Sequence, residues 1–291
     1  MYNLFGYSRD PARRIVRFSL DANLQKALTE YLKPQVTAFD NDCEEIPFDG
    51  KYKPDHGEML VIEDFDDLDN LANAIKSPLD IPVVNPSNFD FDAIKALFFG
   101  ETEADGIESV YLQSFDRRRV ITDQGFSIFH SQGVYKRIEG TGLTIDTKIS
   151  AKLKGKKLKF VSFFYARQIF DMSTYYQEAT DADIKEFAEI PMVHVANLQS
   201  LIDMSDAWIR NKLWLVRESK IFERVASAEI RAVAAEFNIH VTYETLGGDE
   251  VLVIPEDKKE LKTLLRFLDE DYYKSPLSKT SYLSNSKRPI G

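Results

Sequence analysis

The middle of this chain is a series of short runs in which apolar and polar residues alternate, separated by glycine, aspartate or charged turns. The runs follow one another closely between residues 110 and 160, which leaves room only for tight reversals of the chain. This spacing predicts an antiparallel β-meander in the middle of the chain. The predicted strands are 110–115, 120–122, 126–129, 134–138, 143–145 and 149–153, with 156–160 as an extension.

The regions on both sides of the meander show helical periodicity, so the predicted fold class is α+β. A smaller α/β region precedes the meander, and helices flank it. Asp21 is a predicted helix N-cap, and Pro34 is predicted to end that helix. The other N-terminal elements that we expect are strands at 15–20 and 59–62, helices at 65–75 and 91–99, and a proline-rich connector at 77–87.

The polar, acidic stretch 100–106 has the composition of a joint between domains. It predicts an acidic N-terminal α/β region over 1–106 and an α+β domain over 107–291. Within the second domain we expect three parts, namely a basic meander at 110–160, a helical part at 161–237, and a hairpin, helix and tail at 238–291.

Charge is distributed unevenly along the chain, although the net charge is −10. Residues 1–110 hold 10 Lys or Arg against 22 Asp or Glu, residues 111–167 hold 12 against 4, and residues 168–291 hold 15 against 21. An acidic protein does not coat nucleic acid with its whole surface. A basic island between acidic flanks would instead restrict contact with phosphates to one face.

The basic island is the predicted binding site, because a row of cations attracts phosphodiesters through counterion release without reading sequence. If 149–153 is a strand, Lys152 and Lys154 share one face with Ser150. The alternative is that these lysines only keep an edge strand soluble. The candidate DNA-binding residues are Lys148, Lys152, Lys154, Lys156, Lys157, Lys159, Arg117, Arg118, Arg119, Lys136, Arg137, Lys287 and Arg288.

Common catalytic and metal-binding motifs are not found, so we expect no enzyme activity, no metal, no cofactor and no small-molecule substrate. One pattern leaves an alternative open. Glu218 and Lys220, with Asp203 or Asp206 upstream, have the residue types of a metal-dependent nuclease. The same segment also has the periodicity of a helix with a solvated face. A third alternative is an adaptor that binds a protein partner and no nucleic acid.

Two segments carry a resemblance to a known family. They are Phe267–Tyr282, followed by Asn285–Arg288, and Lys159–Thr180. Over residues 110–291 the chain resembles the KwaB-like family of the Kiwa anti-phage defence system. The resemblance implies a DNA-binding effector with little sequence specificity that acts with a membrane-embedded KwaA-like partner. We also expect a homodimer without its own membrane insertion, located in the cytoplasm or at the inner membrane through the partner. The single Cys43 is consistent with a reducing compartment.

Overall fold

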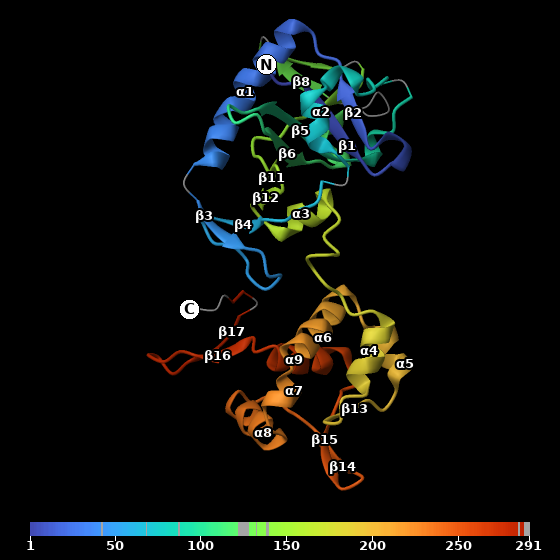
Figure 1. The fold of residues 1–291 in the computed structure, drawn as a ribbon, viewed down its shortest axis with the longest axis vertical. Helices are drawn as coiled ribbons and strands as arrows, with labels where there is room; N and C mark the ends of the chain where they lie inside the picture. Colours follow the sequence, from blue (N-terminus) through green and yellow to red (C-terminus); the bar gives the residue numbers. More distant parts are fainter. Residues whose placement is uncertain are drawn as a thin grey trace. The chain divides into compact units, whose positions relative to one another are not determined.

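The computed structural model describes residues 1–41, 43–67, 69–86, 88–121, 128–131, 133–137, 140–284 and 286–287. The chain forms two compact units (Figure 1). Unit 1 comprises Met1–Phe48 and Pro54–Met172, and unit 2 comprises Asp49–Lys53 and Ser173–Gly291. This division differs from the predicted boundary near residue 106. The described part of the chain contains no helix with the length and apolar character that crossing a bilayer requires.

Unit 1 is built on an eight-stranded mixed sheet in the order β2-β1-β5-β6-β11-β12-β4-β3. Neighbouring strands are antiparallel except β3 and β4, which are parallel. The predicted α+β class is confirmed, but the N-terminal strands and the meander strands share this sheet. Its strands are β1 (Leu4–Ser8), β2 (Ile15–Phe18), β3 (Glu44–Pro47), β4 (Glu58–Ile62), β5 (Ile94–Thr102), β6 (Glu108–Ser114), β11 (Ala151–Lys154) and β12 (Lys157–Phe160).

Helices cover both faces of the sheet. On one face, α1 (Ala22–Asp40) packs Leu32 against a cluster that contains Phe99 and Tyr111. On the other face, α2 (Leu71–Lys76) and α3 (Phe163–Ile169) contact β5 and β6. Because both faces are buried, β5 is apolar on consecutive residues instead of alternating. The predicted helix over 91–99 is therefore wrong: a 3-10 turn at Phe91–Ala93 leads directly into β5.

The first helix continues past the proline that was predicted to end it. Asp21 caps the helix as predicted, and its carboxylate accepts a hydrogen bond from the backbone nitrogen of Leu24 at 2.8 Å. Pro34 lies on the exposed side of α1. Leu32 and Phe39 on either side of it are buried. Burial of these side chains against the sheet offsets the backbone hydrogen bond that proline cannot make.

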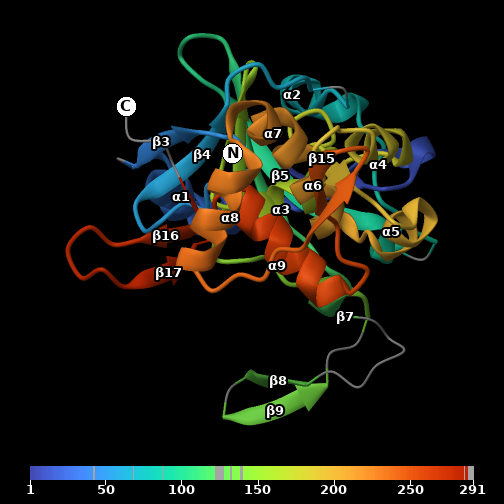
Figure 2. The ribbon, with the colours of Figure 1, turned by 90° about the horizontal axis from the view of Figure 1, so that it is seen from below.

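The predicted meander is interrupted by two short nested ladders. β7 (Val120–Ile121) pairs with β10 (Gly142–Leu143), and between them β8 (Ile128–Ser131) pairs with β9 (Val134–Arg137). We call the described residues of this segment, 120–121, 128–131, 133–137 and 140–143, the arm. Figure 2 shows β8 and β9 set apart from the strands of the main sheet. β11 then returns to pair with β6. The joint predicted at 100–106 is instead the end of β5 and the turn that leads to the adjacent strand β6. Parts of the predicted strands, at 122, 126–127 and 138, lie outside the described residues.

Unit 2 is mainly helical, and its core gathers Ile209, Leu213, Leu261, Leu264 and Leu265. The hairpin and the helix predicted within residues 238–291 are confirmed, and the hairpin turns at Gly247–Gly248. The helices are α4 (Asp181–Ala188), α5 (Leu198–Met204), α6 (Ala207–Ser219), α7 (Ile221–Arg224), α8 (Ser227–Glu236) and α9 (Lys258–Leu268). The strands are β13 (Val193–His194), β14 (Tyr243–Leu246), β15 (Asp249–Val253), β16 (Tyr272–Lys274) and β17 (Ser281–Leu283).

Candidate nucleic-acid interface

Four of the candidate lysines form a row on one face of the sheet. The register places Lys152 opposite Lys159 and Lys154 opposite Lys157 in the antiparallel pair β11–β12. Because paired residues and alternate residues share a face, all four side chains project to the same side. This agrees with the predicted placement of Lys152 and Lys154. The edge-strand alternative does not fit, since β11 and β12 are internal strands.

The two lysines of β11 are held by carboxylates from the acidic N-terminal third. The ammonium nitrogen of Lys152 lies 3.0 Å from a carboxylate oxygen of Asp40 and 3.4 Å from one of Glu103. That of Lys154 lies 2.6 Å from Glu103 and 2.7 Å from Asp105. Hydrogen bonding from Lys154 is the main cause that lowers the pKa of Glu103 to about 2. The same contacts raise the pKa of Lys154.

The two lysines of β12 are also paired. The ammonium nitrogen of Lys157 lies 2.6 Å from Glu45 and 3.1 Å from Glu63. That of Lys159 lies 3.7 Å from the other oxygen of Glu45. The hydrogen bond from Lys157 lowers the pKa of Glu45.

The row is therefore not an open cationic surface, which differs from the expectation behind the candidate site. Five carboxylates surround the four ammonium groups: Asp40, Glu45, Glu63, Glu103 and Asp105. A phosphate that approached this face would have to compete with carboxylates already in place. Acidic residues of the N-terminal third thus neutralise part of the positive charge of residues 111–167 within unit 1.

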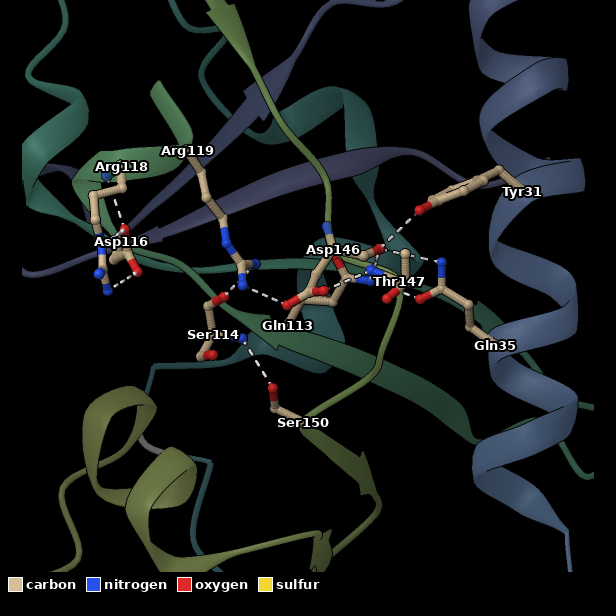
Figure 3. A network of polar contacts seen from close by, with 10 residues as sticks. All are labelled: Tyr31, Gln35, Gln113, Ser114, Asp116, Arg118, Arg119, Asp146, Thr147 and Ser150. Carbon is tan, nitrogen blue, oxygen red and sulfur yellow. Dashed lines mark hydrogen bonds and ion pairs between the residues drawn. The ribbon is translucent and has the colours of Figure 1, made fainter. Parts of the chain in front are cut away.

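A second polar network lies where the arm joins the sheet, centred on Asp146 (Figure 3). The carboxylate of Asp146 pairs with Arg119. Its backbone oxygen accepts hydrogen bonds from the side chains of Gln113 at 3.0 Å, Gln35 at 3.2 Å and Tyr31 at 3.3 Å. Residues of α1, β6 and the turn before β7 therefore all contact one loop. Arg119 is a structural residue of the arm base and is only 26% exposed.

The neighbouring cations at this end of the sheet face solvent. Arg117 and Arg118 belong to a 3-10 turn that precedes β7, and their side chains are 81% and 91% exposed. They pair with Asp92 at 3.4 Å and with Asp116 at 3.2 Å, in exposed contacts that contribute little energy. Lys148 is exposed on the loop that follows Asp146, and no described carboxylate lies within ion-pair distance of it.

The remaining candidate cations of unit 1 lie on the arm and at the far end of β11. Lys136 and Arg137 are exposed on β9. Lys156 is exposed in the turn between β11 and β12, next to the acidic end of the sheet, and has no carboxylate partner among the described residues. The structure thus brings some predicted residues together at the arm, namely Arg117, Arg118 and Lys148. Lys156 lies at the opposite end of β11 from these three residues.

The candidate DNA-binding residues of the C-terminal tail, Lys287 and Arg288, do not belong to unit 1. Lys287 belongs to unit 2 and lies 3.2 Å from Asp269 and 3.0 Å from Asp271. Both carboxylates are buried, and they also hold the buried Lys212 at 2.5 Å and 2.7 Å. Lys287 therefore compensates buried charge in the core of unit 2. Arg288 lies outside the described residues.

The residues of the nuclease alternative do not meet in one site. Glu218 lies near the C-terminal end of α6, where its side chain is 54% exposed, and Lys220 is the helix C-cap. Asp206 is the N-cap of the same helix and is held by Lys262 at 2.8 Å. At 1.5 Å per residue the helix separates Asp206 from Glu218 by about 18 Å, too far to share a metal ion. Asp203 lies before Asp206, in α5.

Comparison with known proteins identifies the family but no structural relative. The family model described as "Kiwa protein KwaB-like" matches residues 110–278, which is more than half of the chain. No curated protein and no solved structure matches the chain. The match begins in β6, and it includes the arm, the lysine row and unit 2 from Ser173 to Ser278. It confirms the family resemblance found in the sequence: this chain belongs to the KwaB-like family, which implies a role in Kiwa anti-phage defence.

Proposed function

We propose that this protein is a defence effector that binds DNA with little sequence specificity and acts by binding instead of catalysis. The observation that supports this is the group of exposed cations at the arm end of unit 1, Arg117, Arg118 and Lys148, with Lys136 and Arg137 on the arm. The side chains of Arg117, Arg118 and Lys148 are exposed, so they can reach phosphates without leaving a buried ion pair. Flexible, exposed cations of this kind contact the backbone of DNA and carry no base information.

The test compares two sets of cations in one binding assay. In the first variant, Arg117, Arg118 and Lys148 are all replaced by glutamine. Affinity for a short duplex is measured by fluorescence anisotropy between 50 and 200 mM salt. Each lost phosphate contact changes the slope of log affinity against log salt by about 0.9, so we expect the slope to decrease by about 3 and low-salt affinity to fall at least roughly 10-fold.

Lys156→Gln is the control, since it removes an exposed cation at the other end of the strands. We expect it to leave the slope unchanged. Lys154→Gln tests the lysine row and should lower stability while leaving the slope unchanged. If the wild-type protein binds no duplex even at low salt, the DNA-binding proposal is wrong and the result supports the alternative of a protein-binding adaptor. If only Lys154→Gln changes the slope of log affinity against log salt, the DNA-binding site is the lysine row and not the arm end of unit 1.

The proposal includes a KwaA-like membrane protein as partner and a homodimer as the functional form. Family membership supports the partner, since a Kiwa role implies action within that system. Co-purification of the full chain with the partner from solubilised membranes tests the first statement. Light scattering tests the second: a dimer has twice the chain mass of 33.4 kDa.

A further inference from the structure

The hairpin of β16 and β17 in unit 2 ends in an exposed apolar side chain. The two strands pair in a sheet of their own, and Leu277, in the turn between them, is 93% exposed. On one face of the ribbon the rings of Tyr273 and Tyr282 stack across the strands, with centroids 5.3 Å apart. This cross-strand pair stabilises the hairpin, so its turn is a preformed projection. Two views show the hairpin extending away from α9 (Figure 1, Figure 2).

The hairpin is basic over its whole length. Residues 272–283 include Lys274 and Lys279 and no aspartate or glutamate, and no acidic residue follows them in the sequence. Neither lysine has a carboxylate partner among the described residues. Lys274 lies on the ribbon face opposite the tyrosine pair, whereas Lys279 lies in the turn, two positions after Leu277. The turn therefore offers a partner an apolar side chain and a cation.

Unit 2 also contains a pocket whose size and charge match this turn. It has a volume of about 170 Å³ and lies between α7, α8 and the end of α9, with walls that include Ile221, Val233 and Leu268. An apolar cavity of about 150 Å³ accommodates benzene, so this pocket has room for the smaller side chain of leucine. Its charged lining residues, Glu229 and Glu270, are both acidic, and neither has a cationic partner in the part of the chain that the structure describes.

The wider wall of the pocket has the same sign of charge. Residues 221–236, which include α7 and α8, hold three glutamates and two arginines. One of the arginines, Arg231, is paired with Glu250. The pocket and its surroundings are thus acidic where the hairpin turn is basic. Opposite charges favour association of these two surfaces and disfavour association of either surface with its own copy.

The hairpin does not fill the pocket of its own chain. β16 begins two residues after Glu270, at the edge of the pocket, and carries the turn about 10 Å from its first residue. Leu277 is correspondingly exposed instead of buried. Two copies related by a two-fold axis remove this mismatch, because each can place its turn at the base of the other hairpin. Such an interface uses the same surfaces on both chains and closes after two copies.

We propose that the β16–β17 hairpin of one copy inserts Leu277 into the pocket between α7, α8 and α9 of a second copy, an inference that rests on the proposed homodimer. Lys279 lies against the acidic rim formed by Glu229 and Glu270. The reciprocal contact forms at the same time on the other side of the two-fold axis. Burial of Leu277 contributes affinity, and the charges at the rim favour the correct orientation.

Two variants each remove one half of the contact. Leu277→Ser removes the inserted side chain, and Val233→Arg blocks the pocket with a large charged one. Both positions are exposed in the single chain, so we expect unchanged thermal melts. Because a dimer contains two contacts, each variant should raise its dissociation constant at least roughly 100-fold in sedimentation equilibrium. Leu246→Ser is the matched control, since Leu246 is 46% exposed beside the turn of the other hairpin of unit 2. It should dimerise like the wild type.

Mixing the two variants tests the turn and the pocket as partners. In a mixed dimer, the intact turn of the Val233→Arg chain meets the intact pocket of the Leu277→Ser chain, so one of the two contacts is restored. We expect this pair, labelled with donor and acceptor dyes, to associate roughly 10-fold more tightly than either variant with itself. Lys279→Glu should weaken the dimer, and Lys279→Glu combined with Glu229→Lys should restore it, because the opposite charges are exchanged.

The outcomes separate this interface from the other proposals. If the wild type is monomeric at every concentration, the interface and the homodimer are both wrong, and the DNA-binding proposal is judged by its own salt slope. If the wild type is a dimer that the variants leave unchanged, or if the mixture associates no better than each variant alone, the interface is wrong while the homodimer stands. If Leu277→Ser leaves the dimer intact but abolishes co-purification with the membrane partner or binding to duplex, the hairpin binds that partner or DNA and the proposal is overturned.

Discussion

At the residue scale, the main finding is that four lysines of the basic island, Lys152, Lys154, Lys157 and Lys159, have carboxylate partners inside the same unit. Sequence correctly predicted that Lys152 and Lys154 share a face, because strand alternation is a local property. It did not predict that Asp40 pairs with Lys152 or that Glu45 pairs with Lys157, since each carboxylate lies more than a hundred positions from its lysine along the chain. Only the sheet order brings α1 and β3 to the same face. The acidic composition of the N-terminal third was the available signal.

Glu103 gives a prediction at this scale. Its pKa is lowered to about 2, mainly by the hydrogen bond from Lys154, so ionised Glu103 stabilises the fold above the ordinary carboxyl pKa near 4.5. That contribution is lost as pH falls from about 5 toward 2. We expect Glu103→Gln to lower the free energy of unfolding at neutral pH by about 1–2 kcal/mol after solvent screening, and to flatten the decline below pH 5.

Urea unfolding across a pH series measures both effects. Glu30→Gln is the control, since Glu30 is exposed on α1 and pairs with no described cation. It should match the wild type within about 0.5 kcal/mol at every pH. Parallel pH profiles for Glu103→Gln and the wild type would show that the ion pairs with Lys152 and Lys154 contribute no stability.

At the element scale, the alternating strands and the capped helices were predictable, and the buried elements were not. The N-cap at Asp21 and the hairpin and helix after residue 238 are local patterns that the structure confirms. β5 was mistaken for a helix because a strand buried on both faces has no alternation to detect. The arm was mistaken for part of the meander, since its strands have the same pattern as those of the sheet. The arm strands differ from the sheet strands in which strands they hydrogen-bond to, and this cannot be read from the alternation of apolar and polar residues.

The proline within α1 makes a prediction about that helix. Pro34 is exposed and lies inside a helix whose neighbouring turns are buried. Pro34→Ala restores a backbone donor and removes the clash of the proline ring with the preceding turn. We expect the free energy of unfolding to rise by about 1–3 kcal/mol. Chemical denaturation measures the change, with Lys33→Ala as the exposed neighbouring control. A less stable Pro34→Ala protein would show that a bend at proline is needed to pack α1.

At the scale of the whole molecule, the chain forms two compact units that each bury apolar side chains of their own. Unit 1 is organised around an eight-stranded sheet, and unit 2 around helices. The sequence predicted two regions but placed the boundary at a polar turn, because composition alone does not distinguish a hairpin turn from a domain joint. The turn between β5 and β6 has the glycine and the acidic residues that a joint also has.

Two cores predict two unfolding transitions in calorimetry of the full chain. Leu158 in β12 and Leu265 in α9 are both fully buried, so they form a matched pair of substitutions. Leu158→Ala and Leu265→Ala should each cost about 2–5 kcal/mol. We expect each variant to lower the temperature of a different transition. A single transition that both substitutions shift equally would contradict this prediction.

Because residues 49–53 belong to unit 2, the two units cannot be expressed as two continuous fragments of the chain. This pentapeptide brings Lys51 to within 3.8 Å of Asp269, although the rest of its unit begins only at Ser173. A downstream fragment started at Ser173 would lack a piece that the upstream fragment carries. If the two fragments are expressed as separate chains, unit 2 is complete only when residues 49–53 of the upstream fragment bind to the downstream fragment.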